Sequence, residues 1–215
     1  MSNLYPIFTN LRGRDVLVVG GGTIASHKVQ ALLDAGAKIK LVSPVVCQCL
    51  TDLADNDQLE IHTRAYESSD MQDVFLVIAA VPDGPLARLI AGDAEKKHIL
   101  CNIVDCTELC SFQVPSVVRN GLLQVAVSTS GASPALAKKI RKELTEKYGS
   151  AYDELLGIMQ SLRKRLKSEY PDDQPLRAAI MEDVVNSEIL ELIYQNKIAE
   201  IDFMVEKIIS EHTSK

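Results

Sequence analysis

Apolar and polar positions alternate in blocks over the first half of the chain. Continuous apolar runs at Val16–Val19 and Phe75–Ala80 are typical of strands that are buried on both faces of a sheet. Shorter apolar runs predict three further strands, over residues 39–42, 59–63 and 99–104. Runs of this kind indicate a sheet that is covered on both sides.

Two of the stretches between these runs carry helix signals. Ala25, Val29 and Leu32 recur at helical spacing, and Gly36 follows as a natural terminator. The second helix is expected over Pro85–Lys97, with proline at a favoured first-turn position. Because strands and helices alternate in this order, we predict an α/β fold with a Rossmann-like, doubly wound parallel sheet.

The pattern changes after about residue 110. Residues 111–128 have extended character around Asn120-Gly121, a strong turn dipeptide, and this predicts a small antiparallel element outside the parallel sheet. From Pro134 onward the spacing is helical. The predicted helical stretches are 134–148, 150–170 and 176–212, with a break at Pro171 and Pro175.

The glycine-rich segment 20–25, after the first strand, fits the pattern G-x-G-x-x-A. Gly20 permits a tight turn, Gly22 lets the backbone approach a pyrophosphate, and Ala25 lets the helix pack closely on the strand. The start of the helix offers free N–H groups and a positive dipole end to phosphates. We therefore predict dinucleotide binding here; the alternative is a glycine turn that only packs.

The acid that usually binds the ribose of NAD is missing from this chain. About 20 residues after the glycines such a site usually has Asp or Glu, but here the second strand ends in Val42-Ser43-Pro44. Ser43 is a candidate to bond a ribose hydroxyl. No arginine follows for a 2′-phosphate, so NAD is favoured over NADP.

Asp105 follows the last strand of the predicted sheet, at its carboxyl end. Ligands of doubly wound sheets bind at these ends. A carboxylate there can take a proton while hydride leaves to a nicotinamide, so Asp105 is a candidate general base. An aspartate that only caps a turn explains its position equally well.

A serine-rich loop, 128–134, joins the antiparallel element to a helix with basic residues, and Ser133-Pro134 is a good helix start. Hydroxyls, backbone amides and lysines could together hold a polycarboxylate. The alternative is a capped helix with a solvated basic face. The candidate substrate contacts are Ser128, Ser130, Gly131, Ser133 and Lys138, and the remaining basic residues of the helix start are Lys139, Arg141 and Lys142.

Composition limits the choice of function. The net charge of -6 argues against broad nucleic-acid binding, which needs a basic face. No apolar run approaches the ~20 residues that span a bilayer, and the first residues lack the layout of a signal peptide, so we expect a cytoplasmic protein. The five cysteines and four histidines show no zinc-type spacing, and we expect free, reduced thiols and no bound metal.

Several short segments, in a fixed order across about the first 150 residues, resemble one family. They are Leu4–Phe8, Leu11–Arg14, Val18–Gly22, Cys101–Asp105, Ser111-Phe112, Pro115-Ser116 and Val127–Pro134. The combination is similar to the precorrin-2 dehydrogenase/sirohydrochlorin ferrochelatase family, whose module also forms the N-terminal part of fused siroheme synthases. The chain departs from the family after the fourth strand, where Ala79–Asp83 and Ala87 stand in place of a usual Thr and Asn.

The resemblance implies three parts and a homodimer. Residues 1–110 would form the NAD-binding Rossmann-like domain, 111–149 a central dimerisation element, and 150–215 a helical domain. Together they would enclose a tetrapyrrole. No partner nucleic acid or membrane is implied, and the methylation that precedes this step would be carried out elsewhere.

The resemblance also implies roles for individual residues. Asp105 would be the catalytic aspartate, and the serine-rich loop would face the substrate or the partner subunit. The expected cofactor contacts are Gly20, Gly22, Thr23, Ile24, Ser43, Pro44 and Val45.

The function that this implies is NAD-dependent oxidation of precorrin-2 to sirohydrochlorin. A second activity, insertion of ferrous iron into the product, stays open because some relatives only oxidise. The alternatives are a non-catalytic NAD-sensing module and a chelatase without redox activity. A hydroxy-acid dehydrogenase is disfavoured because the chain lacks a His or Lys with an Arg at the strand ends.

Overall fold

The structure is a computed structural model that describes residues 4–56 and 58–214. The chain divides between Val114 and Pro115 into two compact units. Each unit has its own hydrophobic core, and each is described separately below.

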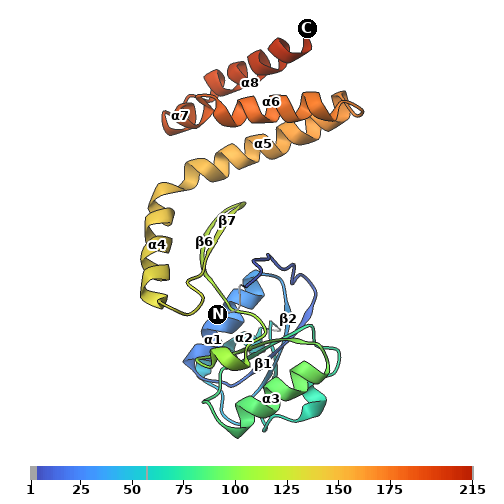
Figure 1. The fold of residues 1–215 in the computed structure, drawn as a ribbon, viewed down its shortest axis with the longest axis vertical. Helices are drawn as coiled ribbons and strands as arrows, with labels where there is room; N and C mark the ends of the chain where they lie inside the picture. Colours follow the sequence, from blue (N-terminus) through green and yellow to red (C-terminus); the bar gives the residue numbers. More distant parts are fainter. Residues whose placement is uncertain (1–3, 57, 215) are drawn as a thin grey trace. The chain divides into compact units, whose positions relative to one another are not determined.

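The first unit is built on a five-stranded sheet in the order β3-β2-β1-β4-β5, in which every neighbouring pair is parallel (Figure 1). Its central strand β1 is buried from its second residue onward, which explains the continuous apolar run in the sequence. The predicted Rossmann-like sheet is confirmed. The strands are β1 (Asp15–Val19), β2 (Lys38–Val42), β3 (Glu60–His62), β4 (Leu76–Ala79) and β5 (Leu100–Ile103).

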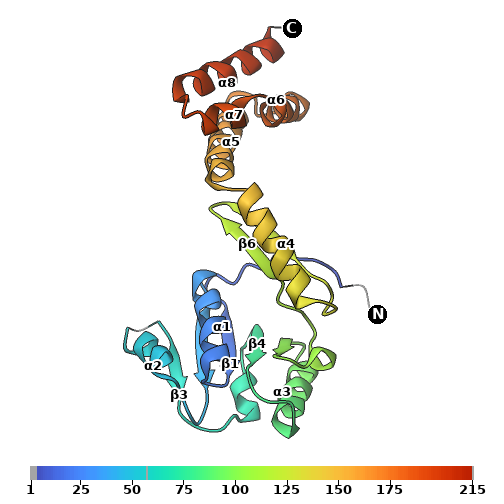
Figure 2. The ribbon, with the colours of Figure 1, turned by 90° about the vertical axis from the view of Figure 1, so that its left-hand side faces the viewer.

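Helices cover both faces of this sheet: α1 (Thr23–Asp34) and α2 (Gln48–Asp55) pack on one face and α3 (Pro85–Lys96) on the other (Figure 2). Gly36 follows α1 in the left-handed conformation, with a φ of 77°, as its role of helix terminator requires. The sequence pattern missed α2. This helix has only eight residues, and its apolar stripe of Leu50, Leu53 and Ala54 is little more than one turn long.

The crossover from β3 to β4 holds only a short 3-10 helix, η1 (Ser68–Met71), in place of an α-helix. Part of the second face of β2 and β3 therefore carries polar residues. Lys38 and Lys40 stand on β2 between buried apolar neighbours. This open face forms a hollow in the first unit.

The second unit begins with a hairpin of β6 (Ser116–Asn120) and β7 (Leu123–Val127), which confirms the predicted antiparallel element. The turn is one residue later than predicted, since Asn120 pairs with Leu123 and the loop consists of Gly121 and Leu122. Gly121 has a φ of 53°, as the first position of a two-residue hairpin turn requires.

The rest of the second unit is helical, as predicted. The predicted break at Pro171 and Pro175 differs in one respect. Pro171 lies in the break, but Pro175 lies in the first turn of a helix, where its missing N–H costs nothing. No helix in the described part of the chain is long and apolar enough to cross a membrane. The helices are α4 (Pro134–Lys147), α5 (Ser150–Glu169), α6 (Gln174–Asn186), α7 (Ile189–Tyr194) and α8 (Ile198–Thr213).

Candidate functional site

The glycine turn after β1 is fitted tightly into the first unit. Gly20 has a φ of 113°, and a side chain there would meet the Ala80 carbonyl oxygen at 2.4 Å. A side chain at Gly21 would meet the Val45 carbonyl oxygen at 2.1 Å. Both positions therefore require glycine, because backbone from two other segments lies against them.

Gly22 differs from its two neighbours. A side chain there would meet no atom of the protein within 4 Å, so the space beside it is open. Gly22 is also the N-cap of α1, and no side chain caps this helix. The first N–H groups of α1 therefore face open space, which fits the phosphates of a dinucleotide. Thr23 and Ile24 begin the helix, and both are exposed.

The segment after β2 lies against the glycine turn. Ser43 is buried, and its hydroxyl donates a hydrogen bond to the Val45 carbonyl oxygen at 2.7 Å. Pro44 and Val45 are exposed, Val45 by 78 %. The structure thus brings Ser43–Val45 beside Gly21, and the proton of the Ser43 hydroxyl is used within the loop. A ligand could use this oxygen only as an acceptor.

Asp105 lies directly beyond β5, at the same edge of the sheet as the glycine turn. It is exposed and has a φ of 60°, in the left-handed region that non-glycine residues rarely adopt. Its carboxylate makes no hydrogen bond or ion pair within the described ranges. Backbone strain of this kind is typical of residues whose orientation matters.

The loop that carries Asp105 is closed by Cys110, after the short helix η2 (Thr107–Leu109). The Cys110 sulfur accepts a hydrogen bond from the Ile103 N–H at 3.2 Å, and its thiol lies 3.2 Å from the carbonyl oxygens of Ile103 and Cys106. Burial raises the pKa of the Cys110 thiol. Cys110 therefore acts as a neutral clamp at the base of the Asp105 loop.

The serine-rich loop belongs to the second unit. The Ser128 hydroxyl accepts from the Ser130 N–H at 3.1 Å, and Ser133 caps α4 by accepting from the Leu136 N–H at 3.2 Å. The predicted N-cap is therefore confirmed. Ser130 and Gly131 both have positive φ values, 51° and 83°.

The basic residues of α4 differ in their surroundings. Lys139 and Lys142 lie 3.9 Å from Glu143 and Glu146, one turn further along the helix. Lys138 is exposed and forms no ion pair within the described ranges. Only part of the predicted basic face is therefore balanced by acids, and Lys138 stays a candidate for binding an anionic substrate.

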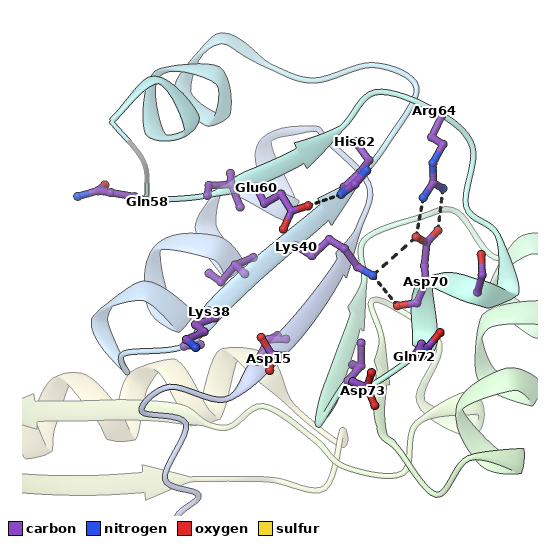
Figure 3. A pocket seen from close by; sticks show the side chains of 16 residues that line it. Asp15, Lys38, Lys40, Gln58, Glu60, His62, Arg64, Asp70, Gln72 and Asp73 are labelled. Atoms are coloured by element: carbon purple, nitrogen blue, oxygen red, sulfur yellow. Dashed lines mark hydrogen bonds and ion pairs between the residues drawn. The ribbon is translucent and has the colours of Figure 1, made fainter.

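A hollow of about 1070 Å³ in the first unit does not include the glycine turn. It lies on the open face of β2 and β3, where Arg64 and Lys40 converge on Asp70 (Figure 3). Arg64 makes two hydrogen bonds to the Asp70 carboxylate, at 2.7 and 2.8 Å, and lowers its pKa. His62 lies 2.7 Å from Glu60. Lys40 and Arg64 pair with Asp70, and these contacts stabilise the fold. Asp15, Lys38 and Asp73 also line the hollow and have no charged partner within the described ranges.

Sequence reasoning missed two residues of the candidate site, Gly21 and Cys110. Gly21 occupies a variable position of the glycine pattern, and its need for glycine comes from Val45, on another strand–loop segment. Cys110 has no motif around it. Its neighbour Ser111 is part of one of the segments that resemble the family, and this segment was the sequence signal that could have drawn attention to Cys110. The Ser111 hydroxyl accepts a hydrogen bond from the Cys101 N–H at 2.8 Å.

Two family descriptions match the chain. One, described as "Putative NAD(P)-binding", matches residues 7–116, and the other, "Sirohaem biosynthesis protein central", matches residues 120–147. The first covers the parallel sheet with its glycine turn and Asp105. The second covers most of the hairpin and α4.

Curated relatives agree with this assignment. A siroheme synthase of Ectopseudomonas mendocina (strain ymp) is 39% identical over 202 residues, which are 94% of this chain and 43% of the relative. A siroheme synthase of Pseudomonas fluorescens (strain SBW25) is 40% identical over 173 residues, 80% of this chain and 37% of the relative. The chain thus spans 43% or less of the length of these two relatives.

One solved structure matches the fold along nearly the whole chain. It is SirC, a precorrin-2 dehydrogenase, with a TM-score of 0.77 and 26% identity over 95% of this chain and 100% of that chain. The family match, the relatives and this structure agree with the resemblance that the sequence motifs indicated. The chain therefore belongs to the family described as "Putative NAD(P)-binding", and its segment 120–147 matches the description "Sirohaem biosynthesis protein central".

Proposed function

We propose that this protein oxidises precorrin-2 to sirohydrochlorin, with NAD as the hydride acceptor. The observation that carries the proposal is the arrangement of one sheet edge. An uncapped helix start beside Gly22 and the free carboxylate of Asp105 both lie at the carboxyl ends of the parallel strands. Matches to a siroheme synthase and to a precorrin-2 dehydrogenase support the same reaction.

The cofactor would be held by the glycine turn and the loop after β2. The open space at Gly22 and the free N–H groups of α1 suit the pyrophosphate. The exposed Pro44 and Val45 would lie along the adenosine, with Thr23 and Ile24 on the other side. The residues directly after β2, 43–47, include no acid to bind a ribose hydroxyl and no arginine to bind a 2′-phosphate, which favours NAD over NADP.

Asp105 would take the proton in this oxidation. When NAD is bound, its nicotinamide supplies the site that receives a hydride from the macrocycle. The carbon skeleton must also lose a proton, and a carboxylate with no partner of its own can receive it. The Cys110 clamp and the left-handed backbone would keep Asp105 directed away from the sheet.

The second unit would hold the tetrapyrrole and form a homodimer. The proposed division is 1–110 for cofactor binding, 111–149 for dimerisation and 150–215 for a helical domain. Candidate contacts to the substrate carboxylates are Ser128, Ser130, Gly131, Ser133 and Lys138. Ferrous iron is proposed as a further substrate, inserted into sirohydrochlorin by the same chain, and the cytoplasm as the location.

An anaerobic assay with precorrin-2 and NAD tests the reaction, with the sirohydrochlorin spectrum as readout. We expect Asp105→Asn to lower turnover by about 100-fold or more, since general base catalysis contributes about that much. Asp73→Asn is the matched control, because Asp73 is exposed and has a φ of 59° but precedes β4 at the opposite end of the sheet. This control should keep the parent activity.

The same assay separates the alternatives. NAD binding without sirohydrochlorin would contradict the dehydrogenase and favour a sensing module. Product formation that does not need NAD would also contradict it. Ferrous iron is added after oxidation is complete, and conversion to siroheme above the protein-free rate would establish the chelatase activity.

A further inference from the structure

Two cysteines lie together beside the glycine turn. The Cys47 and Cys49 sulfur atoms are 3.0 Å apart at the start of α2, and one thiol donates to the other. Cys49 is exposed and Cys47 is half-buried. Cys47 packs against the core of the first unit, as do the remaining three cysteines, whereas Cys49 is exposed.

The two thiols are unequal in reactivity. The hydrogen bond from the Cys47 thiol lowers the pKa of Cys49, whereas the hydrogen bond with Cys49 raises the pKa of Cys47. By contrast, burial raises the pKa of Cys101 to about 12. Since the thiolate is the nucleophile, Cys49 is the first to react and Cys47 is next to it.

The pair is coupled to the cofactor turn through backbone contacts. The Cys47 N–H donates to the Gly21 carbonyl oxygen at 2.8 Å. Gly21 in turn lies so close to Val45 that no side chain fits between them. A change of backbone at Cys47 must therefore displace the glycine turn or the loop after β2, because neither has spare room.

We propose that Cys47 and Cys49 form a dithiol site that reacts with low-molecular-weight disulfides, and that its closure to an intramolecular disulfide weakens cofactor binding at the adjacent glycine turn. The first part is independent of the reaction proposed above. The second part rests on the binding of NAD at the glycine turn.

The chemistry proceeds by two thiol–disulfide exchanges. The Cys49 thiolate attacks a disulfide R–S–S–R, which forms a mixed disulfide and releases one thiolate RS⁻. Cys47 then loses its proton to water and attacks the Cys49 sulfur, which releases the second RS⁻. The two cysteine thiols are oxidised to one disulfide, and the external disulfide is reduced to two thiols.

The first test uses the reduced full-length chain with 5,5′-dithiobis(2-nitrobenzoate) as the disulfide. We expect a fast phase that releases about two thionitrobenzoates per chain and leaves no adduct in the mass spectrum. Cys47→Ser should release one and keep the adduct on Cys49. Cys49→Ser should lose the fast phase, by about tenfold or more in rate.

Other results would overturn the proposed site. A stable adduct on the parent protein would show that Cys47 does not resolve it. A fast phase that survives in Cys49→Ser but disappears in Cys106→Ser would place the reactive thiol elsewhere. Both readouts are independent of NAD and of turnover.

The second test compares NAD binding by calorimetry before and after oxidation. We expect the Kd of the parent to rise about tenfold on oxidation and to return with dithiothreitol. The double variant Cys47→Ser/Cys49→Ser should show one Kd under both conditions. An unchanged Kd in the oxidised parent overturns the coupling, whereas no NAD binding by the reduced parent would instead contradict the proposed function.

Discussion

The sulfur of Cys110 lies 3.2 Å from both the backbone nitrogen and the backbone oxygen of Ile103. Ile103 ends β5, and Asp105 follows two residues later. One side chain therefore joins the two ends of the loop that presents the candidate base. Within the described residues β5 is an edge strand of the sheet, so the Cys110 sulfur pairs with backbone groups of Ile103 that have no neighbouring strand on that side.

Removal of this clamp should cost stability. In Cys110→Ala the Ile103 N–H loses its acceptor, and a buried unsatisfied donor costs about 1–3 kcal/mol. Cys110→Ser keeps a donor and an acceptor and should lose less. Urea denaturation of the three proteins checks this order, and equal midpoints for Ala and parent would show that the sulfur does not hold the loop.

The neighbouring glycines of the turn should respond differently to alanine. Gly21→Ala places a methyl group 2.1 Å from the Val45 carbonyl oxygen, so we expect a loss of about 1–3 kcal/mol in stability. Gly22→Ala has open space and a φ of -91°, so the fold should be unaffected while NAD binding weakens. Thermal unfolding and calorimetry separate the two effects. A stable Gly21→Ala protein would contradict the close approach.

Asp105 should be more important for turnover than for folding. Because its φ of 60° is unfavourable for a side chain, Asp105→Gly removes a backbone cost of about 1–2 kcal/mol while adding freedom to the unfolded chain. We expect a protein that is as stable as the parent, or up to about 1 kcal/mol more stable, and inactive. Denaturation and the oxidation assay on one preparation test this, and a clearly destabilised variant is the result that contradicts it.

Asp70 should make stability depend on pH in the acid range. The Arg64 guanidinium lowers the pKa of Asp70 in the folded state, below the value near 4 of an unfolded chain. Its contribution is therefore fully present above about pH 4 and is lost as the pH falls through the folded pKa.

Asp70→Asn removes this contribution, so its melting temperature should fall below that of the parent at neutral pH and approach it in acid. Asp73→Asn, at an exposed position, serves as the control and should follow the parent throughout. A constant difference between parent and Asp70→Asn at all pH values would contradict the ion pair with Arg64.

The sequence by itself determined the elements with strong local signals. The apolar runs Val16–Val19 and Phe75–Ala80 predicted buried strands, and Ser133-Pro134 predicted a helix start, because these signals depend on neighbours in the chain. The glycine turn and Asp105 were placed at one edge of the sheet by the order of strands and helices alone.

The tertiary structure decided what depends on contacts between distant segments. Gly21 needs glycine because Val45 approaches it, and Cys110 matters because it returns to Ile103. The helix α2 was missed because its eight residues carry only a short apolar stripe, yet the residue before it, Cys47, contacts the glycine turn. Hydrophobic periodicity indicates which residues are buried. It does not indicate which backbone groups of distant segments come into contact, and those contacts form this site.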